Sequence, residues 1–392
     1  MTDPIVIVGA ARTPVGALLG ELSGLTAWEL GAVAIAAAVQ RAGVPRDAVD
    51  EVLMGNVLTA GQGQAPARQA VRRAGLPDAT GAVTINKVCG SGMRAAMLAH
   101  DLLRAGSAEV LVAGGMESMS NAPHLAAVRR GVKAGPVLMR DHMGYDGLED
   151  AYDQGTPMGH YGEACAARYG FSRAQMDAYA MASVQRARRA SETGALAWEL
   201  VPVPGGPGAV APDVCRDERP LKLQPEKIPV LKPAYQSDGV LTAASSSSNA
   251  DGAAALVLMR EHTAQRQGLQ PLARIVGHAV HAQAPQWFTT APIGAVQKLL
   301  HRVGWQVSDV ELWEVNEAFA SVPLALQQEL GVPADALNVH GGACALGHPI
   351  GASGARILVT LLGALRHHGL RRGVAAVCIG GGEATAMALE RL

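Results

Sequence analysis

The sequence predicts an α/β protein made of two similar halves, with a segment of different character inserted between them. Short runs of β-branched residues alternate with Ala-rich helical stretches, which is typical of a mostly parallel sheet covered by helices. Short motifs recur in the same order at nearly constant spacing. Gly accounts for 46 of the 392 residues, well above the usual ~7%. This indicates many tight turns and close backbone approaches.

Strand and helix signals alternate through the first 118 residues. The first predicted strand is 5–8, and an Ala-rich helix over 27–43 follows, closed by Gly43. A helix over 93–104 ends at Gly106. The strands around that helix are predicted at 49–53, 83–88 and 110–113.

Four motifs of the first half return near the C-terminus, at offsets of 261 to 268 residues. The matching stretches are 42–50 and 303–311, 91–94 and 353–356, 114–117 and 380–383, and 7–9 and 275–277. One such match would be noise, but four in one order indicate a duplicated unit. We therefore predict an N-terminal half over 1–118 completed by 251–270, an inserted domain over 119–250, and a C-terminal half over 271–392.

The inserted segment has its own composition. It contains two Pro-rich stretches, at 202–212 and 220–233, and one clear amphipathic helix over 172–192. Ser172 suits the N-cap of that helix and Gly194 its C-terminal end. Long insertions of this kind usually serve binding or assembly.

Composition excludes several classes of protein. With 49% hydrophobic and 17% charged residues, the chain is not disordered. The 33 Lys and Arg balance 34 Asp and Glu, which argues against a nucleic-acid partner. No apolar run reaches the roughly 18 residues of a membrane span, and the N-terminus shows no cationic, apolar signal segment. We expect a cytoplasmic protein.

The cysteines favour free thiols. They are odd in number and show no Cys-x-x-Cys pair: Cys89, Cys165, Cys215, Cys344 and Cys378. This pattern disfavours both a disulfide framework and a zinc site, so no bound metal is predicted.

Cys89 lies where a predicted strand ends and a helix begins, in the motif Cys-Gly-Ser-Gly at 89–92. This position aims the thiol at the positive end of the helix dipole, which is expected to lower its pKa towards the reactive thiolate. The glycines allow a tight turn in which a substrate carbonyl can approach backbone N–H groups. Most free cysteines are simply small buried hydrophobes, and on position alone that alternative stays open.

Three further residues are candidates. His348, between glycines and before a helix, can act as base to a thiol on another loop. Taken alone, a turn histidine with its ring in solvent is the more frequent arrangement. Cys378 is predicted to end the last core strand, and the N–H groups of 380–382 can bind an oxyanion. Asn316 follows a predicted strand over 311–315, where a helix-capping Asn is the more frequent arrangement.

Together these motifs resemble those of the thiolases, the CoA-dependent enzymes that make or cleave 3-ketoacyl thioesters. The resemblance covers nearly the whole chain. It is carried by Val-Gly-Ala-Ala-Arg-Thr-Pro at 8–14, Val-Cys-Gly-Ser-Gly at 88–92, Gly-Met-Glu-Ser-Met-Ser at 115–120, Asn-Glu-Ala-Phe-Ala at 316–320, Gly-Gly at 341–342, Gly-His-Pro-Ile-Gly-Ala-Ser-Gly at 347–354 and Cys-Ile-Gly-Gly-Gly at 378–382. It implies the thiolase fold, in which two βαβ-rich halves form a layered αβαβα core with an inserted loop domain for CoA binding and assembly.

The resemblance also implies the catalytic roles. Cys89 is the nucleophile that takes the acyl group as a thioester, and His348 is its base. The His348 ring, with a water held by Asn316, forms one oxyanion hole. Cys378 removes or returns the α-proton of the second acyl-CoA. The N–H groups of Cys89 and Gly380 form the second hole, where one donor is typically worth ~3–4 kcal/mol of barrier.

The implied CoA contacts are Ser247, Met158, Arg219, Tyr235, Ala318 and Phe319. The sequence departs from the family pattern around them. Residues 244–251 read Ala-Ser-Ser-Ser-Ser-Asn-Ala-Asp, where the family commonly has Gly-Asn-Ala-Ser-Gly before Asp-Gly-Ala-Ala. Leu221 stands where an Arg is usual, so Arg219 or Lys222 is expected to supply charge to the CoA nucleotide.

Phe288 begins the segment 288–292, Phe-Thr-Thr-Ala-Pro, where the family has Met-Gly-x-Gly-Pro. If its ring points into the acyl pocket, chains much beyond about four carbons are disfavoured, at ~1–3 kcal/mol per methylene. If the ring points away from the acyl pocket, longer acyl chains are favoured.

The resulting functional prediction is an acetyl-CoA C-acetyltransferase, which condenses two acetyl-CoA to acetoacetyl-CoA and CoA, or runs the reverse thiolysis. The alternative is a 3-ketoacyl-CoA thiolase acting on longer or functionalised chains. Cys378 argues against a ketosynthase-like enzyme, because decarboxylative condensation needs no α-proton base. A degenerate fold used only for binding is disfavoured, since all four catalytic positions are present. We expect a homotetramer with acyl-CoA substrates and no permanently bound cofactor.

Overall fold

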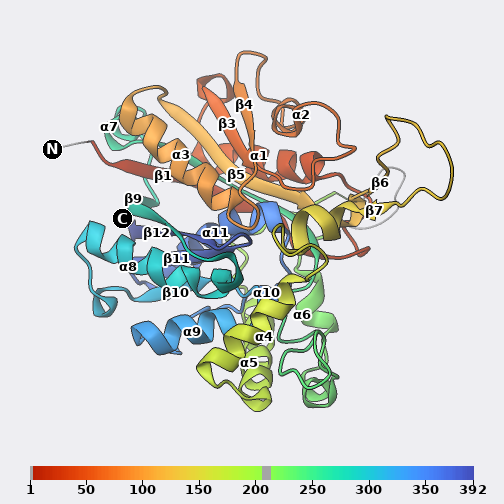
Figure 1. The fold of residues 1–392 in the computed structure, drawn as a ribbon. Coiled ribbons are helices and arrows are strands. Elements are labelled where there is room, and N and C mark those ends of the chain that lie inside the picture. Colours follow the sequence, from red (N-terminus) through yellow and green to blue (C-terminus); the bar gives the residue numbers. More distant parts are fainter. Residues whose placement is uncertain (1–2, 205–212) are drawn as a thin grey trace.

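Strands from both ends of the chain form one path of hydrogen-bonded neighbours in the computed structural model, which describes residues 3–204 and 213–392 (Figure 1). The order is β10-β11-β12-β9-β1-β8-β5-β3-β4, with β2 against β8. The bounds are β1 Ile5–Arg12, β2 Gly16–Ala17, β3 Glu51–Gly55, β4 Gly81–Ile85, β5 Val110–Ser118, β8 Ala250–Arg260, β9 Ala273–Ala282, β10 Leu312–Val315, β11 Arg372–Ile379 and β12 Glu383–Arg391.

The two halves of this path meet at a short antiparallel contact between β1 and β9, where Val6 faces Arg274 and Ile7 faces Ala273. The expectation of a mostly parallel sheet is wrong. Only the β3–β4, β3–β5 and β10–β11 pairs are parallel. β8 runs antiparallel to β1 and β5, and β12 runs antiparallel to β11 and β9. A tight turn joins β11 to β12, so their pairing must be antiparallel.

Helices and strands alternate in layers, as expected from the sequence. Helix α1 (Ala27–Ala42) and α2 (Pro66–Arg73) cover the outer face of the N-terminal strands. Helix α8 (Ala291–Val303) and α9 (Ser321–Leu330) cover the outer face of the C-terminal strands. Buried apolar residues also fill the space between the two sets of strands, and this part of the core contains α3 and α11.

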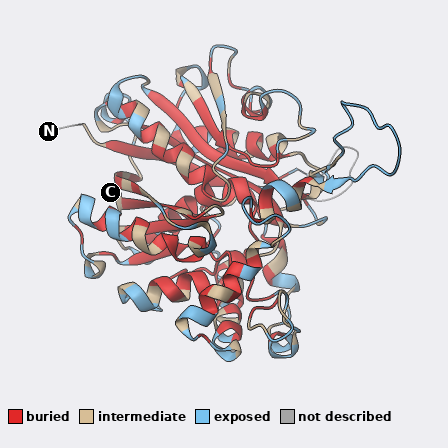
Figure 2. Ribbon diagram, viewed as in Figure 1, coloured by how far each residue is buried: buried red, intermediate tan, exposed pale blue. Residues whose placement is uncertain are grey.

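Helix α3 (Ser91–Ala105) and helix α11 (Ile350–His368) lie side by side in the middle layer. Every residue of α11 from 350 to 365 is buried, which Figure 2 shows as a continuous red helix. Most of these residues are apolar or small, and a helix without a solvent face must be covered on all sides, as it is here between two sets of strands. Both helices begin at motifs predicted to carry chemistry.

Several local predictions are confirmed. Gly43 ends α1 in the left-handed conformation, at φ +68°. Helix α5 (Arg173–Glu192) begins after Ser172, whose side chain accepts the N–H of Gln175 in a capping box. Gly194 lies one residue beyond the Thr193 C-cap.

The ends of the strands differ more from the predictions than the ends of these helices do. β4 stops at Ile85 rather than at residue 88, because the chain turns there to form the loop before α3. β5 continues to Ser118 through Gly114, where a Cβ would lie 2.2 Å from the Ala254 carbonyl oxygen of the neighbouring strand. The strand that carries Cys378 is not the last core strand, because β12 follows it and lies inside the sheet.

Several shorter elements complete the fold, and Figure 1 labels the helices and strands among them. They are β6 His124–Leu125, β7 Arg140–Asp141, α4 Met158–Tyr169, α6 Glu218–Lys222, α7 Glu261–Arg266, α10 Ala343–Leu346 and short helical turns at Arg46–Ala48, Met119–Asn121, Gly144–Leu148, Pro225–Val230, Pro285–Thr290 and Val307–Asp309. Most of the predicted Pro-rich stretch 202–212 lies outside the described residues. Within the described residues, none of the helices combines the length and apolar character needed to cross a bilayer. The predicted domain boundaries remain a prediction.

Candidate active site

Cys89 lies in a tight turn between β4 and α3. Val88, just before it, has φ +46°, a conformation that a β-branched residue rarely adopts. Ser91 stabilises the turn, since its hydroxyl donates to the Val88 carbonyl at 2.7 Å and accepts the Lys87 N–H at 2.8 Å. Gly90 is the N-cap of α3. The half-buried thiol therefore lies beside the first turn of a buried helix.

The end of β11 packs directly against this turn. A Cβ on Gly90 would lie 2.3 Å from Cδ1 of Ile379, so only Gly allows the two segments to approach this closely. Lys87 and Glu383 form an ion pair across the same contact. An interaction with the backbone N–H of Gly380 acts to lower the pKa of the Cys89 thiol, which indicates that this donor lies near the sulfur.

The two thiols are neighbours, and both are protonated at neutral pH in this ligand-free state. Burial raises the pKa of Cys89 to about 11, although hydrogen bonds from the N–H groups of Gly380 and Cys89 act in the opposite direction. Burial raises the pKa of Cys378 well above its ordinary value, and the Cys89 charge adds to this. The expectation that the helix dipole lowers the pKa of Cys89 is therefore wrong, because loss of hydration outweighs the dipole.

His348 lies in the loop between α10 and α11 and is 6% exposed, so it is not a solvent-facing turn histidine. Its backbone N–H donates to the Ser248 carbonyl at 2.8 Å. Its Nδ1 lies 2.5 Å from Oγ of Ser353, and Nε2 has no partner in the structure. Burial, followed by the Arg356 charge, lowers the pKa of His348 to about 3. The ring is a neutral imidazole with one unpartnered nitrogen.

Asn316 follows β10 and is fully buried. It does not cap a helix, because α9 begins only at Ser321, with Ala320 as its N-cap. Its backbone N–H donates to the Ala376 carbonyl at 2.9 Å, and its Oδ1 accepts a long bond from Arg356. Its Nδ2 has no partner. A buried amide without a partner is uncommon, and this one can bind a water or a substrate oxygen.

Glu317 was not singled out from the sequence, although it belongs to the quoted Asn-Glu-Ala-Phe motif. Its buried carboxylate accepts four hydrogen bonds of 2.8–3.0 Å, from Tyr179, Ser183, Asn338 and the Cys344 N–H. These bonds tie helix α5 to the loop that precedes α10. Through these bonds, Glu317 helps to fix the positions of its neighbour Asn316 and of the segment that leads to His348.

Glu117 is a second buried carboxylate that joins separate segments of the chain by hydrogen bonds. Its carboxylate accepts the N–H of Gly351 at 2.9 Å, which ties β5 to the first turn of α11. It also accepts bonds from Asn56, Val57 and Leu58. Burial raises the pKa of Glu117 to about 7 despite these donors. In the sequence it appeared only as a motif residue, Gly-Met-Glu-Ser.

A pocket of about 530 Å³ opens beside His348. Five of the six predicted CoA contacts line it: Ser247, Met158, Arg219, Tyr235 and Phe319. The sixth, Ala318, instead accepts the Ser247 N–H through its carbonyl at 2.9 Å. Met158 links the pocket wall to the thiols, because its Sδ lies 3.4 Å from the position of a Cβ on Gly380.

The two candidate cations differ in their surroundings. Arg219 lines the pocket and its buried Nε has no partner. Lys222 instead pairs with Glu218 at 2.7 Å and with Glu21 at 3.3 Å. Arg219 is the better placed of the two for a phosphate.

Phe288 does not line this pocket. Its side chain is 2% exposed and packs in the core of the C-terminal half. The ring contacts Tyr161 edge to face, with the centroids 6.3 Å apart. The structure thus buries the ring against Tyr161, outside the pocket that the predicted CoA contacts line.

Two groups of potential metal ligands exist among the described residues: His340, His367 and His368, and His100, Asp101 and His278. Neither group includes a predicted catalytic residue.

Comparison with known proteins covers the whole chain. The family description "Thiolase, N-terminal domain" matches residues 5–262, and "Thiolase, C-terminal domain" matches 269–391. Acetyl-CoA acetyltransferase 1 of Arabidopsis thaliana is 49% identical over 98% of this chain and 94% of its own length. Acetyl-CoA acetyltransferase of Rhizobium meliloti is 48% identical over the full length of both chains.

Solved structures agree. The structure of a thiolase from Ascaris suum in complex with coenzyme A superposes with a TM-score of 0.94 at 41% identity, over all of both chains. The acetyl-CoA acetyltransferase of Bacillus anthracis superposes with a TM-score of 0.97 at 38% identity, over all of this chain and 99% of its own.

Proposed function

The chain belongs to the thiolase family, and from that premise we propose that it is an acetyl-CoA C-acetyltransferase. It condenses two acetyl-CoA to acetoacetyl-CoA and CoA, or runs the reverse thiolysis. The observation that carries the assignment of this site is the close packing of the Cys89 turn on the end of the strand that carries Cys378, where Ile379 lies against Gly90. The acetyltransferase relatives, at 44–49% identity among those compared, support the acetyl-CoA substrate.

In the first half-reaction the Cys89 sulfur attacks the carbonyl of acetyl-CoA. Because both groups are neutral in the free protein, the thiol proton passes to the unpartnered Nε2 of His348 as the C–S bond forms. The same proton then goes to the departing CoA sulfur. The products are the acetyl thioester of Cys89 and free CoA. The N–H groups of Cys89 and Gly380, and Nδ2 of Asn316 through a water, stabilise the oxyanions.

In the second half-reaction Cys378 first gives up its thiol proton to solvent and then, as a thiolate, takes the α-proton of another acetyl-CoA. The resulting carbanion attacks the thioester, and the Cys89 sulfur leaves as a thiolate. The Cys89 thiolate then takes up one proton from solvent, which restores the starting state with both thiols protonated. The charge of one thiolate raises the pKa of the other thiol, so the two sulfurs are not charged at the same time.

The CoA moiety is proposed to occupy the pocket of about 530 Å³, with its nucleotide phosphates near Arg219. A guanidinium can donate two parallel hydrogen bonds to a phosphate, which makes it a stronger partner than a neutral donor. Ser247 and the aromatic side chains of Tyr235 and Phe319 supply polar and apolar contacts along the pantetheine.

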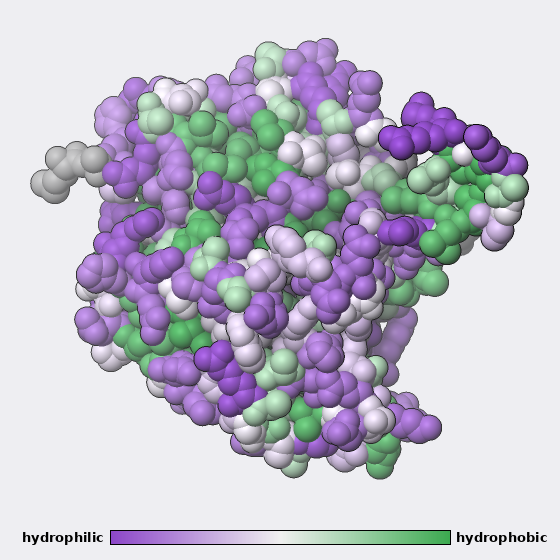
Figure 3. All heavy atoms as spheres, in the orientation of Figure 1, coloured by the Kyte–Doolittle hydropathy of each residue, from purple (hydrophilic) through white to green (hydrophobic). Residues whose placement is uncertain are grey.

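A homotetramer in a reducing compartment is also proposed. All five cysteines are unpaired, which suits the cytoplasm. The projecting loop around 126–139 exposes apolar side chains that Figure 3 shows gathered on it: Val128, Val132, Val137, Leu138 and Met139. Edge strand β4 also exposes Val83. Exposed apolar groups of this size favour association between subunits, and light scattering measures the subunit number.

One observation favours the alternative, a 3-ketoacyl-CoA thiolase for longer chains: the Phe288 ring packs against Tyr161 and does not line the pocket beside His348. Steady-state thiolysis decides between the two. The acetyltransferase should give a higher kcat/KM with acetoacetyl-CoA than with 3-ketohexanoyl-CoA. A preference for the longer substrate would overturn the assignment. No thiolysis of either substrate would overturn the enzymatic proposal altogether.

A further inference from the structure

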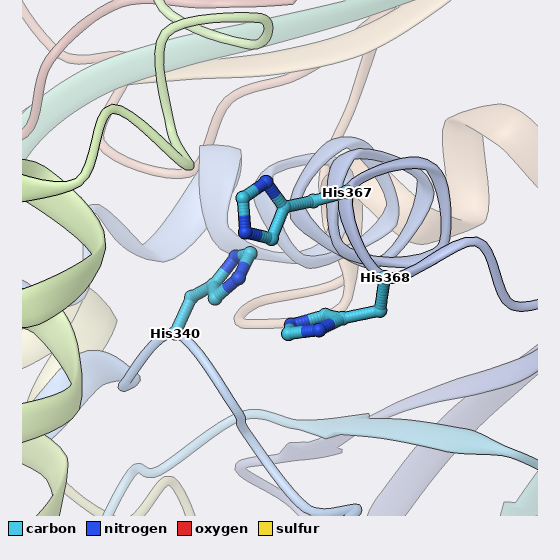
Figure 4. Close-up of side chains that lie close together, drawn as sticks. All are labelled: His340, His367 and His368. Carbon is cyan, nitrogen blue, oxygen red and sulfur yellow. The ribbon is translucent and has the colours of Figure 1, made fainter.

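Three histidines meet on the far side of α11 from the catalytic loop (Figure 4). His367 and His368 are the last two residues of α11, and His340 lies in the loop before α10. Their ring centroids are 4.9–5.7 Å apart. One nitrogen from each ring lies within 4.8 Å of the others. The His340 ring extends from its loop into the space between the two helix-end rings (Figure 4).

This cluster is not held together by hydrogen bonds. His340 is 5% exposed, and its buried Nδ1 has no partner. The second histidine group differs in this respect, because Asp101 there accepts bonds from both His100 and His278, at 3.0 and 2.9 Å. A buried ring nitrogen without a partner has lost its hydration without gaining a hydrogen bond, which is unfavourable. A ligand that uses its lone pair would recover that cost.

The donor set of the cluster is three imidazole side chains, and each offers one nitrogen within 4.8 Å of the others. A neutral imidazole is the form that binds transition metals, whereas a phosphate would require protonated rings. The cluster is therefore suited to a cation.

A cavity of about 380 Å³ lies against the three rings. Its wall carries the side chains of Arg186, Arg189 and Asp335. The Arg186 guanidinium is occupied, since it donates to the Leu337 and Ala334 carbonyls at 2.7 and 2.8 Å. Asp335 supplies a negative charge at the same wall. The cavity has room for an ion with bound water, and the arginines will moderate its affinity.

We propose that His340, His367 and His368 form a binding site for a divalent transition-metal cation, with Zn²⁺ the best fit: three imidazole nitrogens and one water. Zn–N bonds of ~2.0–2.1 Å in a tetrahedron place ligand nitrogens about 3.3 Å apart. His367 and His368 are exposed at a helix end, so their side chains can rotate over the required distance. The inference does not depend on the proposed catalytic activity.

A metal ion bound by the three histidines would connect two parts of the chain that support the active site. α11 begins at the catalytic loop and ends at His368. His340 precedes Gly342, whose N–H donates to Ser183, the residue whose hydroxyl also donates to Glu317. A metal bound at this site would join the end of α11 to that network. The site is therefore structural, and binding should raise the unfolding temperature by mass action.

Calorimetric titration of the chelator-treated, full-length protein with Zn²⁺ tests the proposal. We expect saturable binding of one ion per chain and an increase in unfolding temperature. His367→Ala and His368→Ala change exposed side chains, so they should fold normally. Each should weaken Zn²⁺ binding at least tenfold. His301→Ala is the matched control, because His301 lies in the last turn of α8, outside the cluster, and its loss should change nothing.

The absorption spectrum of bound Co²⁺ distinguishes coordination by histidine from coordination by cysteine thiolate. Co²⁺ bound at this site should show visible absorption without the intense near-ultraviolet band of a thiolate ligand. The proposal is overturned if wild type shows no saturable Zn²⁺ binding, if the double variant His367→Ala, His368→Ala binds as tightly as wild type, or if the thiolate band appears. Stabilisation of the protein by inorganic phosphate through these same residues, without a Zn²⁺ effect, would also overturn it.

Discussion

Nδ1 of His348 lies 2.5 Å from Oγ of Ser353, and this contact determines which nitrogen can act as a base. Ser353 donates its own proton to the Pro349 carbonyl at 3.0 Å, so its oxygen accepts the proton of Nδ1. The lone pair then resides on Nε2, the atom without a partner. Ser353 lies in the first turn of α11, five residues after His348, so the fold of that turn sets the tautomer.

The first prediction is that Cys89 becomes acetylated when the protein is incubated with acetyl-CoA alone. Cys89 lies at the turn before α3 and receives the Gly380 N–H. Mass spectrometry of the quenched protein should locate the acetyl group on the Cys89 peptide. Cys89→Ser should show no label there. Acetyl found only on Cys378, or on neither cysteine, would contradict the assigned roles.

Cys378→Ser should separate the two half-reactions. Acetylation of Cys89 should persist, whereas exchange of the acetyl-CoA methyl protons with deuterated water should fall by ~10²–10⁴-fold, the usual contribution of a general base. The exposed Cys215 offers a matched control, because Cys215→Ser should leave both reactions unchanged. Undiminished exchange in Cys378→Ser would require another base.

The alkylation rate of Cys89 should depend steeply on pH. Its pKa is raised to about 11 by burial, so the reactive thiolate is a small fraction at neutral pH. As pH rises from 7 to 10, that fraction grows roughly tenfold per unit. Iodoacetamide labelling of the Cys89 peptide, followed by mass spectrometry, should therefore accelerate across this range. A plateau below pH 9 would show that the helix dipole outweighs burial.

Arg219→Ala should raise the KM for acetyl-CoA by roughly 10–100-fold, which corresponds to loss of a charged hydrogen bond of ~1.5–3 kcal/mol. The effect on kcat should be smaller, because Arg219 lies at the pocket wall. Lys222→Ala removes a cation already paired with Glu218 and Glu21, and its KM should change much less. The reverse ranking would assign the CoA contact to Lys222.

Phe288→Met should change stability and leave chain-length selectivity unaltered. The edge-to-face contact with Tyr161 is worth ~0.5–1.5 kcal/mol, and a reshaped core adds about 1 kcal/mol. Denaturant unfolding should show that loss. The ratio of kcat/KM for acetoacetyl-CoA and 3-ketohexanoyl-CoA should match wild type, since Phe288 does not line the pocket. A changed ratio would show that Phe288 reaches the acyl chain indirectly.

The sequence by itself determined the parts that depend on local pattern and on long motifs. The helices capped by Gly43 and Ser172 are where their capping residues predicted, because caps are short-range chemistry. The family, the alternation of strands and helices and the layered core followed from motifs and periodicity. The direction of β8 and β12 did not, because a strand's alternation of side chains is the same whether its neighbour runs parallel or antiparallel.

The protonation states of the groups in the site, and the side chains around them, were decided only by the tertiary structure. Burial depends on every layer packed around a group, and it reversed the pKa shift expected for Cys89 from its helix position. It also turned the Phe288 ring towards Tyr161, and it left Nδ2 of Asn316 and Nδ1 of His340 without partners. His340 lies 27 residues from His367 in the chain, and only the packing of α11 against its loop brings their rings together.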